Sequence, residues 1–273
     1  MPPNPRQLIL NLLLAAADGE IAARDAVASG ALFGIRENSV RVALARLAGA
    51  GLIEAAGRAS YRLGPQGAGL AAEVATWRRA EQRAQVWQGG WVAVHAGALG
   101  RSDRVALRAR DRALALLGLR ELDRGLFLRP DNLAGGVAGV RERLHKLGIE
   151  PEAAVFQAAG LDAAREKRAR ALWDGRALSR RYRQTRQQLE RWLARAGELE
   201  PDVAARESFL LGNEAIRQLV FDPLLPEPLV DVGERRAFAE ALQHFDLAGH
   251  AIWRRFFQQA LPATASGRGK KLQ

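Results

Sequence analysis

Three helical patterns follow one another closely in residues 6–63, and a hairpin pattern comes directly after the third. An apolar stripe runs through residues 6–17, and further helices are predicted at about residues 22–29 and 37–50. Between the second and third helices, Phe33-Gly34-Ile35 predicts a turn, because glycine adopts backbone angles that larger residues resist. This succession constrains the fold more than any other feature of the chain.

The third helix has two different faces. Val40, Leu44 and Leu47 recur at spacings i, i+4 and i+7, which places them on one apolar face. The opposite face carries small or hydrogen-bonding residues, namely Asn38, Arg41, Val42 and Ala45. The apolar face is therefore predicted to be buried, and the opposite face to meet solvent or a partner.

The hairpin pattern has a Gly-Arg tip. Two short strands are predicted at residues 51–54 and 59–63, on either side of a tip at residues 55–58. A hairpin placed directly after a helix–turn–helix describes a winged helix–turn–helix. Such a helix fits the DNA major groove, and an arginine on the wing can follow phosphates or enter the minor groove. A small packed module without DNA, or a protein-binding winged helix, remains the alternative.

The expected DNA contacts divide between helix and wing. In the helix, the residues expected to contact DNA bases or backbone are Asn38, Ser39, Arg41, Val42 and Arg46. Of these, Arg46 is expected to lie nearer to phosphate. In the wing Arg58 is the expected contact, supported by Ser60 and Arg62, while Tyr61 is structural or bonds phosphate. Between Arg36 and Arg62 five arginines outnumber two glutamates, in a chain of formal net charge +11. A polyanionic partner is therefore plausible.

Strand and helix patterns alternate in the middle of the chain. Strands are predicted at residues 91–95, 125–130 and 153–157, with helices at 101–117 and 137–147. This alternation is typical of a small ferredoxin-like α/β domain.

Helical patterns dominate the rest of the chain. They cover about residues 161–172, 175–196, 202–220 and 234–260, and the three prolines of residues 221–228 interrupt them. We therefore predict an α+β fold with an N-terminal winged helix–turn–helix, a central ferredoxin-like domain and a C-terminal all-helical domain. The predicted boundaries are 1–70 for the DNA-binding domain, 71–88 for a linker helix, 89–160 for the central domain, 161–262 for C-terminal dimerisation and effector binding, and 263–273 for a disordered basic tail.

The sequence shows few of the features of a catalytic or metal-binding site. It has no cysteine and none of the common nucleophile, phosphate-loop or zinc motifs. His244 and His250 lie six positions apart, so they face different directions on a helix. The strand at 91–95 offers no carboxylate for a metal-dependent nuclease. We expect no enzyme activity, no cofactor, no metal and no membrane segment, and a cytoplasmic protein, with a nuclease or RNA-binding protein as the alternative.

A basic cluster lies in the C-terminal helices. It contains Arg180, Arg181, Arg183 and Arg186, and three interpretations compete: a solvated helix face, a DNA-backbone contact, or a clamp for ligand phosphates. Trp173, Trp192 and Trp253 are predicted to be core or dimer-interface anchors. With Phe256 and Phe257, Trp253 is expected to form the dimer interface.

Motifs along nearly the whole chain resemble the PaaX family of transcriptional repressors of phenylacetate catabolism. The matching segments are 39–47, 51–53 and 57–63, then 87–91, 125–132 and Leu172-Trp173, and finally 222–226. The resemblance implies a homodimer on a palindromic double-stranded DNA operator. It also implies release by a coenzyme A thioester, phenylacetyl-CoA in the best-known members. Residues 232–235 depart from the family's usual tryptophan-containing turn.

Overall fold

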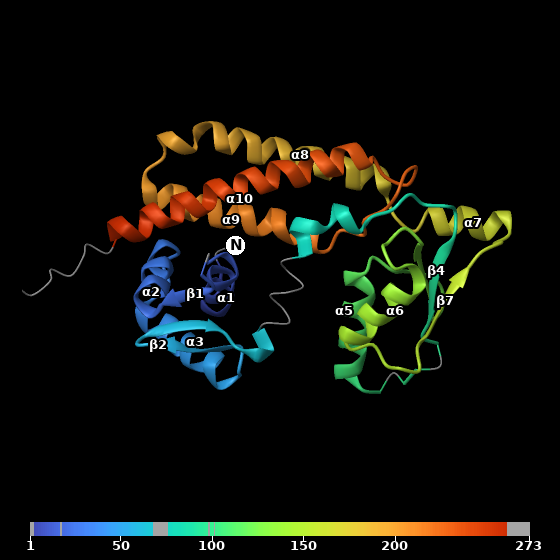
Figure 1. The fold of residues 1–273 in the computed structure, drawn as a ribbon, viewed down its shortest axis with the longest axis horizontal. Coiled ribbons are helices and arrows are strands. Elements are labelled where there is room, and N and C mark those ends of the chain that lie inside the picture. The colour runs from blue at the N-terminus through green and yellow to red at the C-terminus, as the bar shows by residue number, and fades with distance from the viewer. Residues whose placement is uncertain (1–2, 17, 68–75, 98, 101, 261–273) are drawn as a thin grey trace, which may run out of the picture. The chain divides into compact units, whose positions relative to one another are not determined.

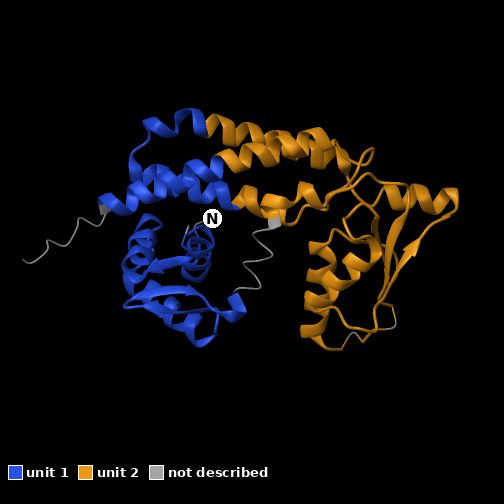
Figure 2. Ribbon diagram, in the orientation of Figure 1, with its two compact units in different colours: residues 1–72, 193–213, 245–273 blue, residues 73–192, 214–244 orange. Residues whose placement is uncertain are grey.

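The structure, a computed structural model, describes residues 3–16, 18–67, 76–97, 99–100 and 102–260. The chain divides into two compact units (Figure 2), and each unit is assembled from separate segments of the sequence. Unit 1 takes residues 1–72, 193–213 and 245–273, and unit 2 takes residues 73–192 and 214–244. Each unit contains helices and one antiparallel sheet, so the chain is an α+β protein. The three-domain boundaries remain a prediction.

Unit 1 begins with three helices and a small sheet (Figure 1). The helices are α1 (Pro5–Ala15), α2 (Ala23–Leu32) and α3 (Glu37–Gly49). The strands are β1 (Glu20–Ala22), β2 (Ile53–Gly57) and β3 (Ser60–Leu63), in the order β1-β3-β2. The three predicted helices are confirmed to within a few residues at their ends.

Two glycines allow the close approach of α2 and α3. Gly34 adopts a φ of +67° in the turn between the helices, as predicted from its conformational freedom. Gly30 lies where α2 meets α3, and a Cβ there would stand 2.7 Å from Val40 Cγ2. Val40, Leu44 and Leu47 are buried in the core of unit 1, which confirms the predicted apolar face of α3.

The small sheet differs from the prediction in two ways. β1 was not predicted, because three residues are too short to show a strand period; it pairs with β3 from Glu20↔Arg62 to Ala22↔Ser60. The tip also lies further along the chain than residues 55–58, because Gly57 pairs with Ser60. The turn is therefore formed by Arg58 and Ala59.

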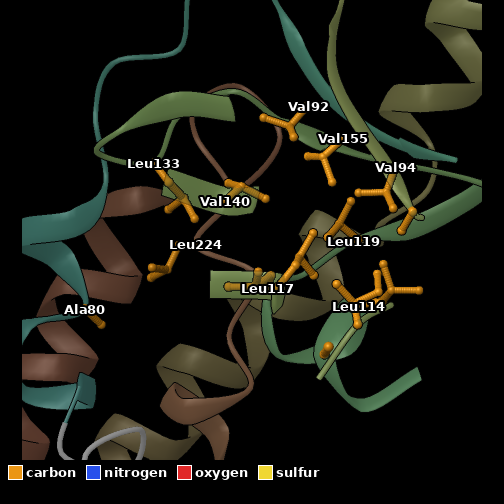
Figure 3. Close-up of a cluster of buried hydrophobic side chains, with 14 residues drawn as sticks. Ala80, Val92, Val94, Leu114, Leu117, Leu119, Leu133, Val140, Val155 and Leu224 are labelled. Atoms are coloured by element: carbon orange, nitrogen blue, oxygen red, sulfur yellow. The ribbon is translucent and has the colours of Figure 1, made fainter. Parts of the chain in front are cut away.

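Unit 2 contains a four-stranded antiparallel sheet and two helices in the order β4, α5, β5, β6, α6, β7. Their bounds are Trp91–His95, Arg104–Leu116, Arg120–Asp123, Leu126–Pro130, Gly136–Lys146 and Ala154–Ala158. The strand order is β5-β6-β4-β7. One apolar cluster fills the space between sheet and helices (Figure 3); it includes Val92 and Val94 of β4 and Val140 of α6. β5 was not predicted, because Leu122 is its one buried residue.

The segment predicted as a linker helix, residues 71–88, is not an α-helix in its described part. It forms two short 3₁₀ helices, η1 (Thr76–Arg79) and η2 (Glu81–Arg83). Beyond η2 the backbone bonds to the loop after β6 instead, with Gln85 donating to the Asn132 carbonyl at 2.7 Å. Residues 71–75 lie outside the described residues.

Four α-helices complete the described chain: α7 (Ala163–Arg170), α8 (Gly175–Arg195), α9 (Pro201–Val220) and α10 (Val232–Ala260). All four predicted C-terminal helices are confirmed. The proline-rich interruption separates α9 from α10, and Leu224 and Leu225 within it are buried. α9 and α10 each contribute residues to both units. The basic tail predicted for 263–273 lies outside the described residues.

Candidate nucleic-acid interface

The solvent face of α3 presents the predicted helix contacts. Asn38, Ser39, Arg41 and Arg46 are exposed, and Val42 is 40% exposed. This placement follows from the sequence, because the apolar face of α3 is fixed in the core and its remaining positions must point outward. An exposed face of amide, hydroxyl and guanidinium groups can hydrogen-bond base edges or phosphates.

The hairpin places its arginines differently. Arg58 is exposed at the turn, beside Ala59, whose φ is +59°. Arg62 is exposed on β3, and Ser60 is half-buried. Tyr61 is half-buried and packs against the unit 1 core, which favours its structural role.

Some of these arginines have carboxylate partners. Arg41 lies 2.7 Å from Glu37, and Arg62 lies 2.7 Å from Glu54. Exposed ion pairs of this kind are worth little, so a phosphate can replace either carboxylate at low cost. Arg46 and Arg58 have no such partner among the described residues. The face therefore keeps uncompensated positive charge at the helix and at the wing.

A groove of about 490 Å³ opens beside α3, and one of its two walls was not predicted from the sequence. One wall carries Asn38, Ser39, Val42 and Arg46 of α3. The other wall is the start of α1, with Asn4, Pro5 and Arg6. Only the capping pattern of Asn4 and Pro5 was readable from the sequence, and capping does not show which helix lies opposite.

The basic cluster of α8 belongs to unit 2 and is partly neutralised. Arg183 pairs with Glu234 at 2.9 Å, and Arg186 pairs with Glu190 at 3.1 Å and with Glu234 at 3.6 Å. Arg180 and Arg181 are exposed, without a carboxylate partner in the described chain. Two of the four arginines therefore serve contacts within the chain, and a contact with ligand or phosphate remains a prediction.

A buried polar network holds the interior of unit 2. Arg129 is 2% exposed and donates to the carbonyls of Leu117, Pro130 (3.1 Å) and Pro223 (3.3 Å) and to Asn132 Oδ1 (3.0 Å). Asn132 Nδ2 donates to the Leu224 carbonyl at 2.8 Å. Because the guanidinium is desolvated, burial lowers the pKa of Arg129 to about 9.

The second half of the network surrounds Asp222. Its carboxylate accepts a hydrogen bond from the Tyr182 hydroxyl and another from the Leu224 amide at 2.8 Å. Burial raises the pKa of Asp222, against the opposing effects of the Arg235 charge and the Tyr182 hydrogen bond. Arg235 is 1% exposed and donates to Glu81 Oε1 at 2.6 Å. The network joins β6, the proline-rich connector, α8, α10 and η2, which indicates a structural role.

The aromatic residues expected at a dimer interface are used within the chain. The Trp253 ring lies 6.0 Å from Phe209 of α9 and 5.6 Å from Phe256, and Phe256 is buried. Phe209 in turn lies 5.2 Å from Phe33, at the end of α2, and belongs to the unit 1 core. Trp253 and Phe256 therefore take part in packing within the chain, Trp253 and Phe257 are half-buried, and the assignment of the three residues to a dimer interface remains a prediction. Trp173 and Trp192 are buried, as predicted for core residues.

The described residues contain neither a cluster of metal-binding side chains nor a helix that could span a membrane. No group of three or more His, Cys, Asp or Glu side chains there could hold a metal ion. His250 pairs with Asp246 at 3.6 Å along α10. None of the helices described is both long and apolar enough to cross a membrane.

Family models match both the N-terminal and the C-terminal part of the chain. A family model described as PaaX-like protein matches residues 4–67, and one described as PaaX-like protein C-terminal domain matches residues 173–255. Together the two matches span more than half of the chain. The solved structure of uncharacterized protein Rv0674 from Mycobacterium tuberculosis matches with a TM-score of 0.61 and 23% identity. The match covers 93% of this chain and 98% of that one, and at this identity it shows the fold alone. No curated protein matches.

Proposed function

This chain belongs to the PaaX-like proteins, and from that premise we propose that it is a sequence-specific DNA-binding transcriptional repressor. The proposed operator is a palindromic DNA duplex. Residues 5–63 serve as a winged helix–turn–helix, with α3 as the recognition helix and the β2–β3 hairpin as the wing.

One observation carries the proposal. The exposed face of α3 and the tip of the hairpin bear guanidinium, amide and hydroxyl groups, while the apolar face of the same helix is buried in the unit 1 core. A recognition helix requires this division, because its base-reading side must be free while its other side is held rigidly. Asn38, Ser39, Arg41 and Val42 contact bases or backbone, and Arg46 contacts phosphate.

The wing supplies the second contact. Arg58 lies at its tip and reaches phosphates or the minor groove, while Ser60 and Arg62 support it. The β4–β7 segment supports the proposed ferredoxin-like domain, because it has the element order βαββαβ.

A homodimer completes the proposal. One recognition helix and one wing bind weakly, whereas two half-sites about one helical turn apart multiply the affinity. Release follows when an effector prefers a conformation that no longer matches the operator. Following the family resemblance, that effector is an aryl- or acyl-coenzyme A thioester such as phenylacetyl-CoA.

The site is tested by separating phosphate contacts from base contacts. An operator duplex is first selected from random genomic fragments with the wild-type chain. Arg58→Ala is expected to weaken binding to every sequence and to reduce the salt dependence by about one unit. Asn38→Ala or Arg41→Ala is expected also to relax sequence preference. If Arg41→Ala and Arg58→Ala both leave operator affinity intact, the assignment is wrong.

The dimer and the effector need separate measurements. Light scattering after size exclusion is expected to report a dimer at micromolar concentration, and a monomer would count against the palindromic operator. A thermal-shift screen of coenzyme A thioesters is expected to identify a stabilising ligand. A thioester that stabilises the protein but leaves the operator bound would contradict the proposed release.

A further inference from the structure

The groove beside α3 continues the face that we propose to contact DNA. Asn38, Ser39 and Val42 belong both to the exposed face of α3 and to one wall of the groove. A duplex lying against that face therefore also borders the groove. The opposite wall is the start of α1, which no contact in the proposed function includes.

The start of α1 is held firmly in place. Asn4 caps the helix by accepting a hydrogen bond from the Gln7 amide at 2.8 Å, and Pro5 occupies the first helical turn. Leu8 and Ile9, one turn further on, are completely buried in the unit 1 core. Arg6 is thus an exposed side chain on a fixed backbone.

The residues that line the groove are suited to bind phosphate groups joined by sugars. Its polar residues are Asn4, Arg6, Asn38, Ser39 and Arg46, which supply two guanidinium groups and no carboxylate. Arg6 and Arg46 are exposed and have no carboxylate partner in the described chain. Apolar side chains such as Val42 and Leu52 line the remainder and can contact deoxyribose.

We propose that this groove holds the sugar–phosphate backbone of one DNA strand, with Arg6 and Arg46 contacting its phosphates from opposite walls. The inference rests on the proposed function and adds Arg6 of α1 to the DNA-binding residues. It assigns Arg6 a positioning contact that carries no base information, because phosphate contacts fix register and orientation without reading sequence.

The test measures the salt dependence of binding by the full-length chain. Fluorescence anisotropy follows the operator duplex and an unrelated duplex between 50 and 200 mM salt. Arg6→Gln is expected to reduce the slope of log K against log salt by about 0.9, the value for one lost phosphate contact, on both duplexes. Arg6→Lys keeps the charge and is expected to restore most of the slope.

A matched control removes one exposed arginine elsewhere in unit 1. Arg206 of α9 does not line the groove, so Arg206→Gln is expected to leave the slope at the wild-type value. Circular dichroism checks that Arg6→Gln is folded, as expected for an exposed side chain.

The outcomes separate this inference from the proposed function. If Arg6→Gln leaves the slope unchanged while Arg58→Ala reduces it, the groove assignment is overturned and the DNA-binding function stands. If Arg6→Gln weakens binding to the operator alone, Arg6 reads bases and the phosphate assignment is overturned. If the wild-type chain binds neither duplex, the proposed function itself fails.

Discussion

Arg129 is a cation buried inside unit 2, and no carboxylate of the described residues forms a salt bridge with it. Its donors bond to main-chain carbonyls and to the Asn132 side chain, and the nearby charges of Asp131 and Asp222 also oppose its desolvation. These acceptors lie in β6, in the segments that directly follow α5 and β6, and in the proline-rich connector. A side chain that is distant in sequence therefore fixes the connector in place. A lysine there has fewer donors and a different shape, and would satisfy fewer of these carbonyls.

Tyr182→Phe tests the other half of this network. The substitution removes the hydroxyl donor from a buried carboxylate oxygen of Asp222, and a buried acceptor left unpaired costs about 1–3 kcal/mol. Unfolding by urea, followed by tryptophan fluorescence, is the measurement, since five of the six tryptophans lie in unit 2. The control is Tyr61→Phe, on the half-buried tyrosine of unit 1, which is expected to change stability little.

The cost of Tyr182→Phe is expected to depend on pH. Burial raises the pKa of Asp222 in the folded chain, so its contribution to stability is complete below the unfolded value and is lost as pH rises through the folded pKa. Because the hydroxyl lowers this pKa, its removal raises the folded pKa further. The destabilisation is therefore expected to increase as pH rises through the folded pKa of Asp222. A cost that stays constant while Asp222 ionises would contradict a hydrogen bond from Tyr182 to the ionised carboxylate.

At the scale of elements, long periodic segments were predictable and short ones were not. α8, α9 and α10 repeat their apolar pattern over many turns, so their ends fell close to the predicted positions. β1 and β5 have three and four residues, and pairing with a neighbouring strand, rather than their own pattern, defines them.

In the candidate site, too, some residues could be predicted from the sequence and others could not. The exposed positions of α3 follow from its own period, so its outward residues could be named from the sequence. Arg6 could not be named, because the packing of α1 beside α3 depends on contacts between distant segments. Likewise, nothing in the pattern around Phe209 indicates that it packs on Phe33.

Phe209→Ala tests whether α9 supports the helix–turn–helix. Phe209 is 9% exposed, and removing a buried phenyl ring costs about 3–5 kcal/mol. Its partner Phe33 leads into the turn before α3, so hydrogen exchange is expected to accelerate in α2 and α3. The control is Phe221→Ala, which removes a ring that is 45% exposed in unit 2. Unchanged protection of α2 and α3 in Phe209→Ala would show that α9 does not support them.

At the scale of the whole molecule, sequence order and spatial order differ. Unit 1 combines the first helices with parts of α9 and α10, and those two helices also contribute to unit 2. A change in the unit 2 part of α9 or α10 therefore has a covalent, helical path to Phe209 or Trp253, respectively, and both residues pack with the unit 1 core. Such a path suits the proposed release by an effector, which requires a helix with two alternative arrangements.

The division of the chain also predicts the behaviour of a fragment. Residues 1–67 contain the three helices and the small sheet but lack Phe209 and Trp253, both of which pack with the unit 1 core. A domain of about 60 residues buries a smaller share of its surface than a larger domain does, and it is marginally stable even when its core is complete. The fragment is therefore expected to unfold at lower urea concentration than α1–α3 do in the full chain. Hydrogen exchange in urea compares the stability of α1–α3 in the fragment and in the full-length chain at the same backbone amides. The measurement needs no DNA. Full-length Phe209→Ala is expected to lie between the two, because it loses one of the aromatic contacts and keeps the other. Equal protection in the fragment and the full chain would mean that the N-terminal helices are an independent domain, and that any signal from α9 and α10 must reach them by another route.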